Sequence, residues 1–394
     1  MLDLQLSDRV QQIKPSPTLA VSKRAAELKA EGKDIIGLGV GEPDFDTPEH
    51  IKQAAIEAIN KGFTKYTAVD GTPSLKKAII AKLERDNGLK YQASQVLVSC
   101  GGKQSFFNMS LAFINPGDEV IIPAPYWVSY PDMVVVAGGV PVIVETDDST
   151  RFKMTAAQLE AAITPKTKLV VLNSPSNPTG VAYSSEELTA IAEVLRKHPQ
   201  VFIASDDMYE YIWWAEFEFA NILNVAPDLY ERTIVLNGVS KAYSMTGWRI
   251  GYAAGPEKLI KAMAKVQSQS TSNPTSISQV AAEAALNGGR ECVEPMVKVF
   301  KTRHDYVVSS LNDIKGISCV PGDGAFYAYP NVKEAMKIKG CATDIEFAEL
   351  LLNEAGVALV PGSAFGTPGY MRFSYATSND VLTDALNRIK KVMG

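Results

Sequence analysis

The sequence predicts an α/β fold of three layers, α/β/α, in which helices cover both faces of a mostly parallel seven-stranded sheet with one antiparallel strand. A smaller α+β domain is expected beside it. Seven short β-rich runs lie between residues 96 and 254. Helix-like stretches such as 105–114 and 184–197 separate several of these runs, and this alternation is typical of parallel sheets. The chain has 394 residues, which is long for one hydrophobic core.

The β-rich runs are expected to form strands, in chain order, at 96–99, 119–123, 140–145, 168–173, 201–205, 233–237 and 248–254. Between the sixth run and the seventh there are only ten residues, which include two glycines and show little helical pattern. A parallel crossover needs about a dozen residues or more and usually contains a helix. We therefore predict that the seventh strand runs antiparallel to the sixth.

The two ends of the chain differ from its middle. A helical segment at 18–32 precedes a loop at 35–48 that is rich in glycine and proline. After a long helical stretch at 275–313, further strand-like runs occur within 317–375. We therefore expect a large domain over residues 46–313 and a small domain built from residues 1–45 and 314–394.

Composition argues against several classes of protein. The net charge of −5 gives no electrostatic reason to expect a nucleic acid or an anionic membrane as a partner. No apolar run approaches the roughly 18 residues of a membrane span, and the N-terminal residues lack the pattern of a signal peptide. The four cysteines and three histidines are scattered, without the spacing of a metal site. We expect a cytoplasmic protein with no metal, nucleic-acid or membrane partner.

Chemically active side chains follow the predicted strands. In an open α/β sheet, ligands bind beyond the carboxyl ends of the strands. The residues that come after these ends are Gly101, Gly102, Lys103, Trp127, Asn177, Asp206, Tyr209 and Lys241, and Arg249 lies at the start of the reversed seventh run. Singly, a glycine turn, an aspartate after a strand or a loop lysine is more often a turn, a helix cap or a solvated charge.

In combination these residues match the needs of one ligand class, a phosphorylated pyridine aldehyde. The turn at 101–103 leads into a helix whose free N–H groups would hold a phosphate. Trp127 offers a flat surface for stacking, Asp206 an acid for a ring nitrogen, and Lys241 an amine for the aldehyde. The pattern therefore predicts covalent cofactor chemistry at this edge of the sheet.

Three segments, in this order and spacing, resemble class I aminotransferases of the aspartate aminotransferase type: 173–180 (NSPSNPTG), 205–210 (SDDMYE) and 240–252 (SKAYSMTGWRIGY). The resemblance implies fold type I and dependence on pyridoxal 5′-phosphate. Further segments that look like the family are 41–51, 65–79, 101–104, 125–133, 324–327 and 371–376, so that the resemblance covers essentially the whole chain.

The resemblance implies a role for each residue around the cofactor. Lys241 would bind the cofactor covalently and would later move the proton between the substrate α-carbon and the cofactor. Asp206 would pair with the pyridinium nitrogen, and Trp127 would stack on the ring. Tyr209 and Asn177 would hydrogen-bond the ring hydroxyl oxygen. Of these residues, Lys241, Asp206 and Tyr209 are the expected catalytic ones.

The resemblance also implies how the phosphate is held. Arg249, the backbone of Gly102 and Lys103, and the hydroxyl of Ser240 would surround it. Tyr66 would reach the phosphate of the other subunit, which implies a homodimer with shared active sites.

Two positions depart from the family pattern. Asp207 stands where the family usually has glutamate, although Asp206, the residue with the chemical role, is intact. Gly238 stands where some relatives have a phosphate-binding serine, which leaves the contribution of Ser240 open.

For the substrate, the resemblance implies that Arg372 clamps the α-carboxylate with two parallel hydrogen bonds, a task that suits a guanidinium better than an ammonium. The backbone of Gly41 would meet the substrate, with Trp127 and Asn177 beside it.

The substrate side chain is expected to meet a different cation. Dicarboxylate-specific relatives use an arginine from a segment that is here 266–280 and holds no basic residue. A subgroup that includes bacterial aspartate and prephenate aminotransferases has a lysine at Lys103 and uses it with a Ser/Thr pair, here Ser16 and Thr18. The hypothesis is reversible, ping-pong transamination of L-aspartate with 2-oxoglutarate, with aromatic amino acids or prephenate as the alternative. Lys103 could instead serve only to attract the phosphate.

Other functions are compatible with some of the same residues. A β-lyase, a kynurenine aminotransferase or a cyclopropane-forming synthase would share the cofactor site. A catalytically inactive binding domain is disfavoured because Lys241 is present and no basic helix-turn-helix extension is seen. A Rossmann nucleotide-binding enzyme is disfavoured because no G-x-G-x-x-G motif follows the first β-rich run.

Overall fold

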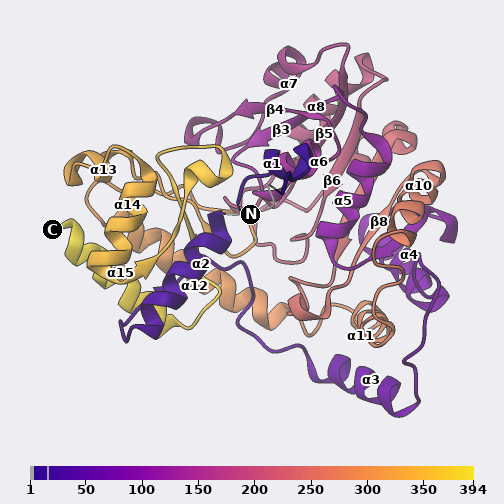
Figure 1. The fold of residues 1–394 in the computed structure, drawn as a ribbon, viewed down its shortest axis with the longest axis horizontal. Helices are drawn as coiled ribbons and strands as arrows, with labels where there is room; N and C mark the ends of the chain where they lie inside the picture. The colour runs from indigo at the N-terminus through magenta and orange to yellow at the C-terminus, as the bar shows by residue number, and fades with distance from the viewer. Residues whose placement is uncertain (1–3, 16) are drawn as a thin grey trace.

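The computed structural model describes residues 4–15 and 17–394. Its central feature is a seven-stranded sheet with the strand order β2-β8-β7-β6-β5-β3-β4 (Figure 1). The strands are β2 (Val96–Ser99), β3 (Glu119–Ala124), β4 (Val140–Glu145), β5 (Thr167–Asn173), β6 (Phe202–Asp206), β7 (Thr233–Gly238) and β8 (Gly251–Ala254). Each of them overlaps one of the seven predicted runs.

The strand β8 runs antiparallel to its two neighbours, β7 and β2, whereas the other neighbouring pairs of this sheet are parallel. The predicted direction of the seventh strand is therefore confirmed. The strand is shorter than predicted, because residues 248–250 precede it. Arg249 has a left-handed backbone with φ of 56°, a conformation that does not fit a strand. It lies in the turn that enters β8.

Alternate residues of the strands belong to two hydrophobic cores on opposite faces of the sheet. Val96 and Val98 of β2 share one core with residues of α4 (Pro73–Asn87), α8 (Ser185–Lys197) and α11 (Ser276–Asn287). Leu97 belongs to the other core, with residues of α5 (Gly102–Phe113), α6 (Ser129–Val136) and α10 (Glu257–Ser268). Successive side chains of a strand point to opposite faces, so this alternation produces the three layers that the sequence predicts.

The other α-helices within the described ranges are α1 (Asp8–Gln12), α2 (Pro17–Ala30), α3 (Glu49–Asn60), α7 (Ala156–Ala162), α9 (Ile222–Val225), α12 (Glu294–Asn312), α13 (Lys333–Lys339), α14 (Asp344–Leu350) and α15 (Asn379–Met393). The predicted helical stretch 275–313 is two helices, α11 and α12, because the chain turns at Gly289, which has φ of 73°. Within residues 4–15 and 17–394, no helix is long and apolar enough to cross a membrane.

Two small sheets combine segments from both ends of the chain. The strand β1 (Ile36–Gly37) pairs in parallel with β10 (Val357–Ala358). β12 (Met371–Ser374) lies between β11 (Val360–Pro361) and β9 (Tyr327–Ala328), antiparallel to both. The strand β1 lies in the segment 35–48 that was expected to be a loop, and its two residues, one of them a glycine, are too few to show a strand pattern. This pairing supports our proposal that residues 1–45 and 314–394 form one small domain.

A buried ion pair connects α4 with the ends of β6 and β7. Lys82 contacts the carboxylate of Glu210, and its Nζ donates to Oδ1 of Asn87 at 2.6 Å. Asn237, in β7, donates to Oε1 of Glu210 at 2.7 Å. Removing one partner of such a pair typically costs about 3–5 kcal/mol, because the other charge stays buried. The pair therefore holds the two strand ends that carry Asp206 and Lys241 in a fixed relation.

Candidate active site

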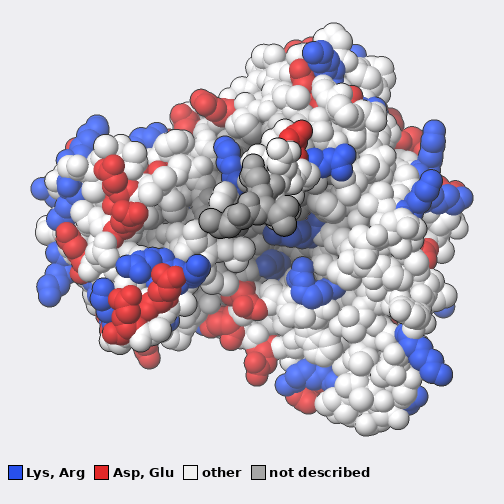
Figure 2. All heavy atoms as spheres, viewed as in Figure 1, with Lys and Arg blue, Asp and Glu red and all other residues white. Residues whose placement is uncertain are grey.

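A cavity of about 360 Å³ opens where the carboxyl ends of the central strands face β9 and β12. The part of the molecule that contains β9, β11 and β12 is called the second lobe, and the part that contains the seven-stranded sheet is the first (Figure 1). Basic side chains gather around the hollow on this face of the molecule (Figure 2). The predicted site residues that line the cavity are Gly41, Gly102, Lys103, Trp127, Asn177, Asp206, Tyr209, Ser240, Lys241, Arg249 and Arg372. Residues scattered over the sequence are thus brought to one place.

Lys241 lies in the loop that follows β7. Its Nζ donates a hydrogen bond to the carbonyl oxygen of Gly41 at 2.6 Å. Burial of the amine, together with the positive charge of Arg372, lowers the pKa of Lys241 to about 8. A lysine with this pKa is partly neutral near neutral pH, and the neutral amine is the nucleophilic form.

Asp206 is the last residue of β6. Its Oδ2 accepts a hydrogen bond from the hydroxyl of Tyr130, and its Oδ1 accepts one from the Met208 N–H at 3.3 Å. Burial raises the pKa of Asp206 to about 6, and the two hydrogen bonds oppose that rise. Tyr130 was missed in the sequence analysis, although it stands only three residues after Trp127.

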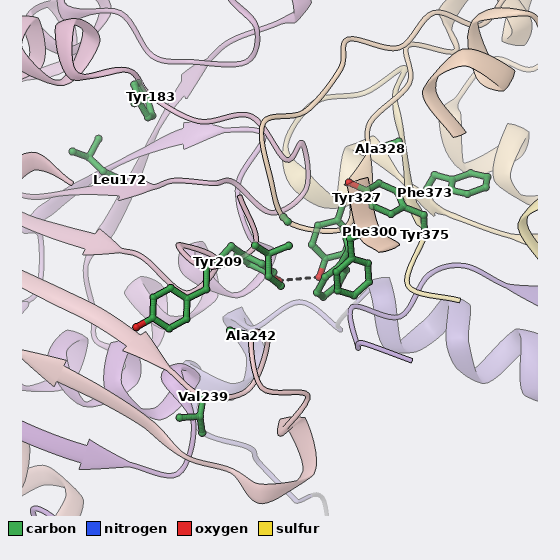
Figure 3. Close-up of a cluster of buried hydrophobic side chains, with 14 of the residues drawn as sticks. Leu172, Tyr183, Tyr209, Val239, Ala242, Phe300, Tyr327, Ala328, Phe373 and Tyr375 are labelled. Carbon is green, nitrogen blue, oxygen red and sulfur yellow. Dashed lines mark hydrogen bonds between the residues drawn. The ribbon is translucent and has the colours of Figure 1, made fainter. Parts of the chain in front are cut away.

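Tyr209 connects the two lobes of the molecule. Its hydroxyl is hydrogen-bonded to that of Tyr327 at 2.9 Å. Figure 3 shows this bond, which joins the segment after β6 to β9. Burial raises the pKa of Tyr209 well above its usual range, so the phenol stays protonated. Tyr327 was also missed, because its side chain reaches the site only through the packing of the lobes. A Cβ on Gly41 would collide with the Tyr327 hydroxyl, so this approach requires glycine.

Arg372, on β12, is only 3% exposed. It donates to the Gly39 carbonyl oxygen at 2.6 Å and to Oδ1 of Asn177 at 2.9 Å, and its buried Nε has no hydrogen-bond partner among the described residues. No carboxylate within residues 4–15 and 17–394 forms an ion pair with it. A buried cation that has only neutral partners favours an anionic ligand, because an anion would offset the cost of its desolvation.

An anion site lies at the start of α5. The first helical residue is Gly102, and no side chain caps the N–H groups of this turn. Gly101 has φ of 88°, and a Cβ there would strike the guanidinium of Arg249. Arg249 is held by the carbonyl oxygens of Thr246 at 2.9 Å and Cys100 at 3.3 Å. Free N–H groups beside a guanidinium are the donor set that binds phosphate.

Lys103 and Trp127 form the adjoining wall of the cavity. The Nζ of Lys103 lies 5.1 Å from the centre of the Trp127 ring. Partial desolvation and the charge of Arg249 lower the pKa of Lys103. The rings of Trp127 and Tyr130 form a T-shaped contact, with their centres 5.2 Å apart. Lys103 is therefore held close to a flat aromatic surface and to the phosphate-type site.

The loop that carries Gly41 is fixed at its far end. Asp44 forms a double hydrogen-bonded ion pair with Arg303 of α12 at 2.7 and 2.8 Å. Thr47 donates to the carbonyl oxygen of Ser244 at 2.7 Å and accepts from Nε1 of Trp248 at 2.9 Å. These bonds tie the loop to the segment that carries Lys241.

Three predicted residues are not placed in the cavity. Tyr66 is 91% exposed and does not line it. Ser16 lies outside the described residues, and the side chain of Thr18 is likewise not described. Lining residues that the sequence analysis did not name are Leu19, Val128, Ser129, Tyr130, Asp132, Asn173, Met208, Thr246 and Tyr327. Asn173 has a structural link to the site, since its Oδ1 accepts from the Asn177 N–H at 2.9 Å.

The part of the chain that the structure describes contains no group of three or more His, Cys, Asp or Glu residues placed to hold a metal ion. Its cavity chemistry rests on amine, guanidinium, carboxylate and phenol groups. A model of the protein family described as aminotransferase class I and II matches residues 33–389.

The chain belongs to the class I and II aminotransferases.

Relatives of this aminotransferase match along nearly its entire length. The aspartate/prephenate aminotransferase of Nitrosomonas europaea is 59% identical, over 99% of this chain and 100% of its own. The crystal structure of the aspartate aminotransferase from Rhizobium meliloti has a TM-score of 0.96 and 51% identity, and the match covers 99% of both chains. The Thermus thermophilus aspartate aminotransferase with maleate has a TM-score of 0.92 and 44% identity, over 99% of this chain and 100% of that one. The predicted family and fold are confirmed.

The lowered pKa of Lys241 gives a prediction that needs no substrate. Competitive acetylation over a pH series, read by mass spectrometry, should show Lys241 becoming reactive with a midpoint near pH 8. Exposed lysines of the same aminotransferase should follow the ordinary value of about 10.4. Since the folded pKa is below the unfolded one, this residue's contribution to stability should rise with pH across that window. A Lys241 midpoint near 10 would contradict the environment described above.

Proposed function

We propose that this aminotransferase uses pyridoxal 5′-phosphate to exchange the amino group of L-aspartate with 2-oxoglutarate, in the cytoplasm. One observation supports this most directly. The nucleophilic amine of Lys241, the carboxylate of Asp206 and the buried guanidinium of Arg372 line the same cavity. The relatives named above, which are called aspartate or aspartate/prephenate aminotransferases, support the choice of reaction.

The residues present fit the proposed cofactor. The uncapped start of α5 and the side chain of Arg249 suit its phosphate. Because Gly101 has no Cβ, the guanidinium of Arg249 can lie directly against the turn that leads into α5. Trp127 suits the flat ring, and Asp206, which also lines the cavity, suits the ring nitrogen. When bound, pyridoxal phosphate supplies an aldehyde that condenses with amines and a ring that accepts electrons from the substrate α-carbon.

Each of four residues that line the cavity then has a defined task. Lys241 would hold the cofactor through its amine, and the same amine, when free, would move the proton between the substrate α-carbon and the cofactor. Asp206 keeps a negative charge opposite the ring nitrogen, and Tyr209 donates a hydrogen bond from its protonated phenol. Arg372 binds the α-carboxylate in place of its present neutral acceptor at Gly39.

We propose that Lys103 recognises the side-chain carboxylate of aspartate. It is a cation of the cavity to which we assign neither the aldehyde, the phosphate nor the α-carboxylate, and the segment 266–280, which begins at the end of α10, holds no basic residue. Ser16 and Thr18 are proposed to assist it. Prephenate or aromatic amino acids remain the alternative substrates, supported by the name of the Nitrosomonas europaea relative.

We also propose a homodimer with shared sites. Tyr66 is 91% exposed, and nearby Ile56, Ile59 and Phe63 are 46%, 52% and 40% exposed. Exposed apolar side chains in one region are typical of an interface. In the proposed dimer, Tyr66 donates to the phosphate in the partner's cavity.

The central test is covalent attachment of the cofactor. Wild-type protein with pyridoxal phosphate should turn yellow, and borohydride treatment should fix the cofactor on Lys241, as located by mass spectrometry. Lys241→Ala should lose this attachment, and its aspartate turnover should fall by about 10⁴-fold, because the proton-transferring group is gone. Lys90→Ala, a change at an 81% exposed side chain, is the matched control. A wild-type protein that stays colourless would overturn the proposal.

The substrate assignment predicts a selective loss. Lys103→Ala should lower kcat/KM for aspartate by roughly 10- to 100-fold, the value of a hydrogen bond to a charged group. The kcat/KM for phenylalanine, which has no side-chain carboxylate, should change little. Single-turnover rates with both substrates check this. Equal losses would instead indicate that Lys103 serves the phosphate.

The dimer proposal predicts a mass of two chains by light scattering. Tyr66→Phe should leave that mass unchanged and should weaken cofactor binding by roughly tenfold, because one donor to a charged phosphate is lost. Cofactor titration followed by absorbance measures the affinity. A monomer in solution, or an unchanged affinity in Tyr66→Phe, would contradict the shared site.

A further inference from the structure

Tyr130 has a place in the site that the tasks above leave unexplained. It is the second residue of α6, is 2% exposed, and donates its hydroxyl to Oδ2 of Asp206. The centre of its ring lies 4.7 Å from that of Phe106 and 5.2 Å from that of Trp127, with which it forms a T-shaped contact at an interplanar angle of 86°. These contacts fix the position of the hydroxyl on two sides.

Asp206 depends on this hydroxyl. Among the described residues no cation forms an ion pair with Asp206, and its other oxygen receives only the Met208 N–H, at a long 3.3 Å. Burial favours the neutral form of the carboxyl, and the hydrogen bond from Tyr130 works against it. Burial also raises the pKa of Tyr130 well above its usual range, so the proton stays on the phenol. Tyr130 is therefore the donor in this hydrogen bond and Asp206 the acceptor.

The neighbours of this pair do not replace it. Tyr209 and Asp207 are the other titratable groups that act on Tyr130, and neither donates to Asp206. Asp207 is engaged elsewhere, with Ser205 at 2.7 Å and Asn221 at 2.8 Å. Tyr209 is engaged with Tyr327. Within the described chain, Tyr130 is thus the only side chain that donates to the carboxylate of Asp206, since the Asn173 amide donates to its backbone carbonyl oxygen.

Resting on the proposed function, we propose that Tyr130 is a positioning residue. Its hydroxyl holds one oxygen of Asp206 so that the carboxylate stays charged and oriented for the ring nitrogen of the cofactor. The edge contact with Trp127 sets the same residue against the proposed stacking surface, so one side chain adjusts both the ring's acid partner and its flat neighbour. In this role Tyr130 acts through Asp206 and Trp127.

The test is a double-mutant cycle that joins Tyr130→Phe with Asp206→Asn. The dissociation constant of pyridoxal phosphate, measured by titration, is one readout, and kcat and KM for aspartate are the others. Tyr130→Phe should weaken cofactor binding by roughly tenfold and lower kcat, with KM for aspartate nearly unchanged. In the Asp206→Asn background the same change should have less than about a twofold effect, because the partner it acts through is gone.

Tyr375→Phe is the matched control, since the Tyr375 hydroxyl is also buried and has no hydrogen-bond partner among the described residues. It should leave both readouts unchanged. Thermal unfolding of both Tyr→Phe variants verifies that each is folded, which is expected because the ring contacts are kept. Equal effects of Tyr130→Phe in the two backgrounds, or no effect in either, would overturn the inference. Failure of the wild-type protein to bind the cofactor would overturn the proposed function instead.

Discussion

The site depends on a concentration of positive charge that the fold has to hold together. Lys103, Lys241, Arg249 and Arg372 all line one cavity, which also holds the carboxylates of Asp132 and Asp206. Burial, and to a smaller extent repulsion from the neighbouring cations, lowers the pKa of the two lysines. Like charges that share a partly buried cavity raise the free energy of the folded protein, and bound anions would offset this cost. A phosphate and substrate carboxylates, as we propose, would supply them.

The connection between β7 and β8 is the structural device that makes this possible. In the paired register, Gly238 lies opposite Gly251, so the loop that carries Lys241 leaves and returns at the same edge of the sheet. A Cβ on Gly251 would strike the backbone at Gly102, so the strand packs directly against the start of α5. The short connection thus brings Lys241, Arg249 and the free N–H groups of α5 to one place. A helical crossover of ordinary length would have separated them.

The elements of the sheet and most of the lining residues could be predicted from the sequence because both follow from local rules. Apolar runs mark strands, and residues after strand ends meet at one edge. What could not be predicted depends on contacts between distant segments. Tyr130 reaches Asp206 because α6 directs its side chain there. Tyr327 reaches Tyr209 because β9 packs against the segment that follows β6. The strand β1 is two residues long and exists only through its pairing with β10.

The backbone carbonyls at the site illustrate the same limit and also explain its readiness for anions. The carbonyl oxygen of Gly39 accepts a hydrogen bond from Arg372, and that of Gly41 accepts one from Lys241. Every residue has a backbone carbonyl, so this role cannot be predicted from residue type. Neutral carbonyl oxygens satisfy the donors without neutralising them. A carboxylate adds an opposite charge and can accept two parallel hydrogen bonds from a guanidinium, so exchange of Gly39 for a carboxylate at Arg372 is favourable. Because the ion pair of Asp44 with Arg303 anchors the loop, this exchange can occur while the rest of the loop keeps its place.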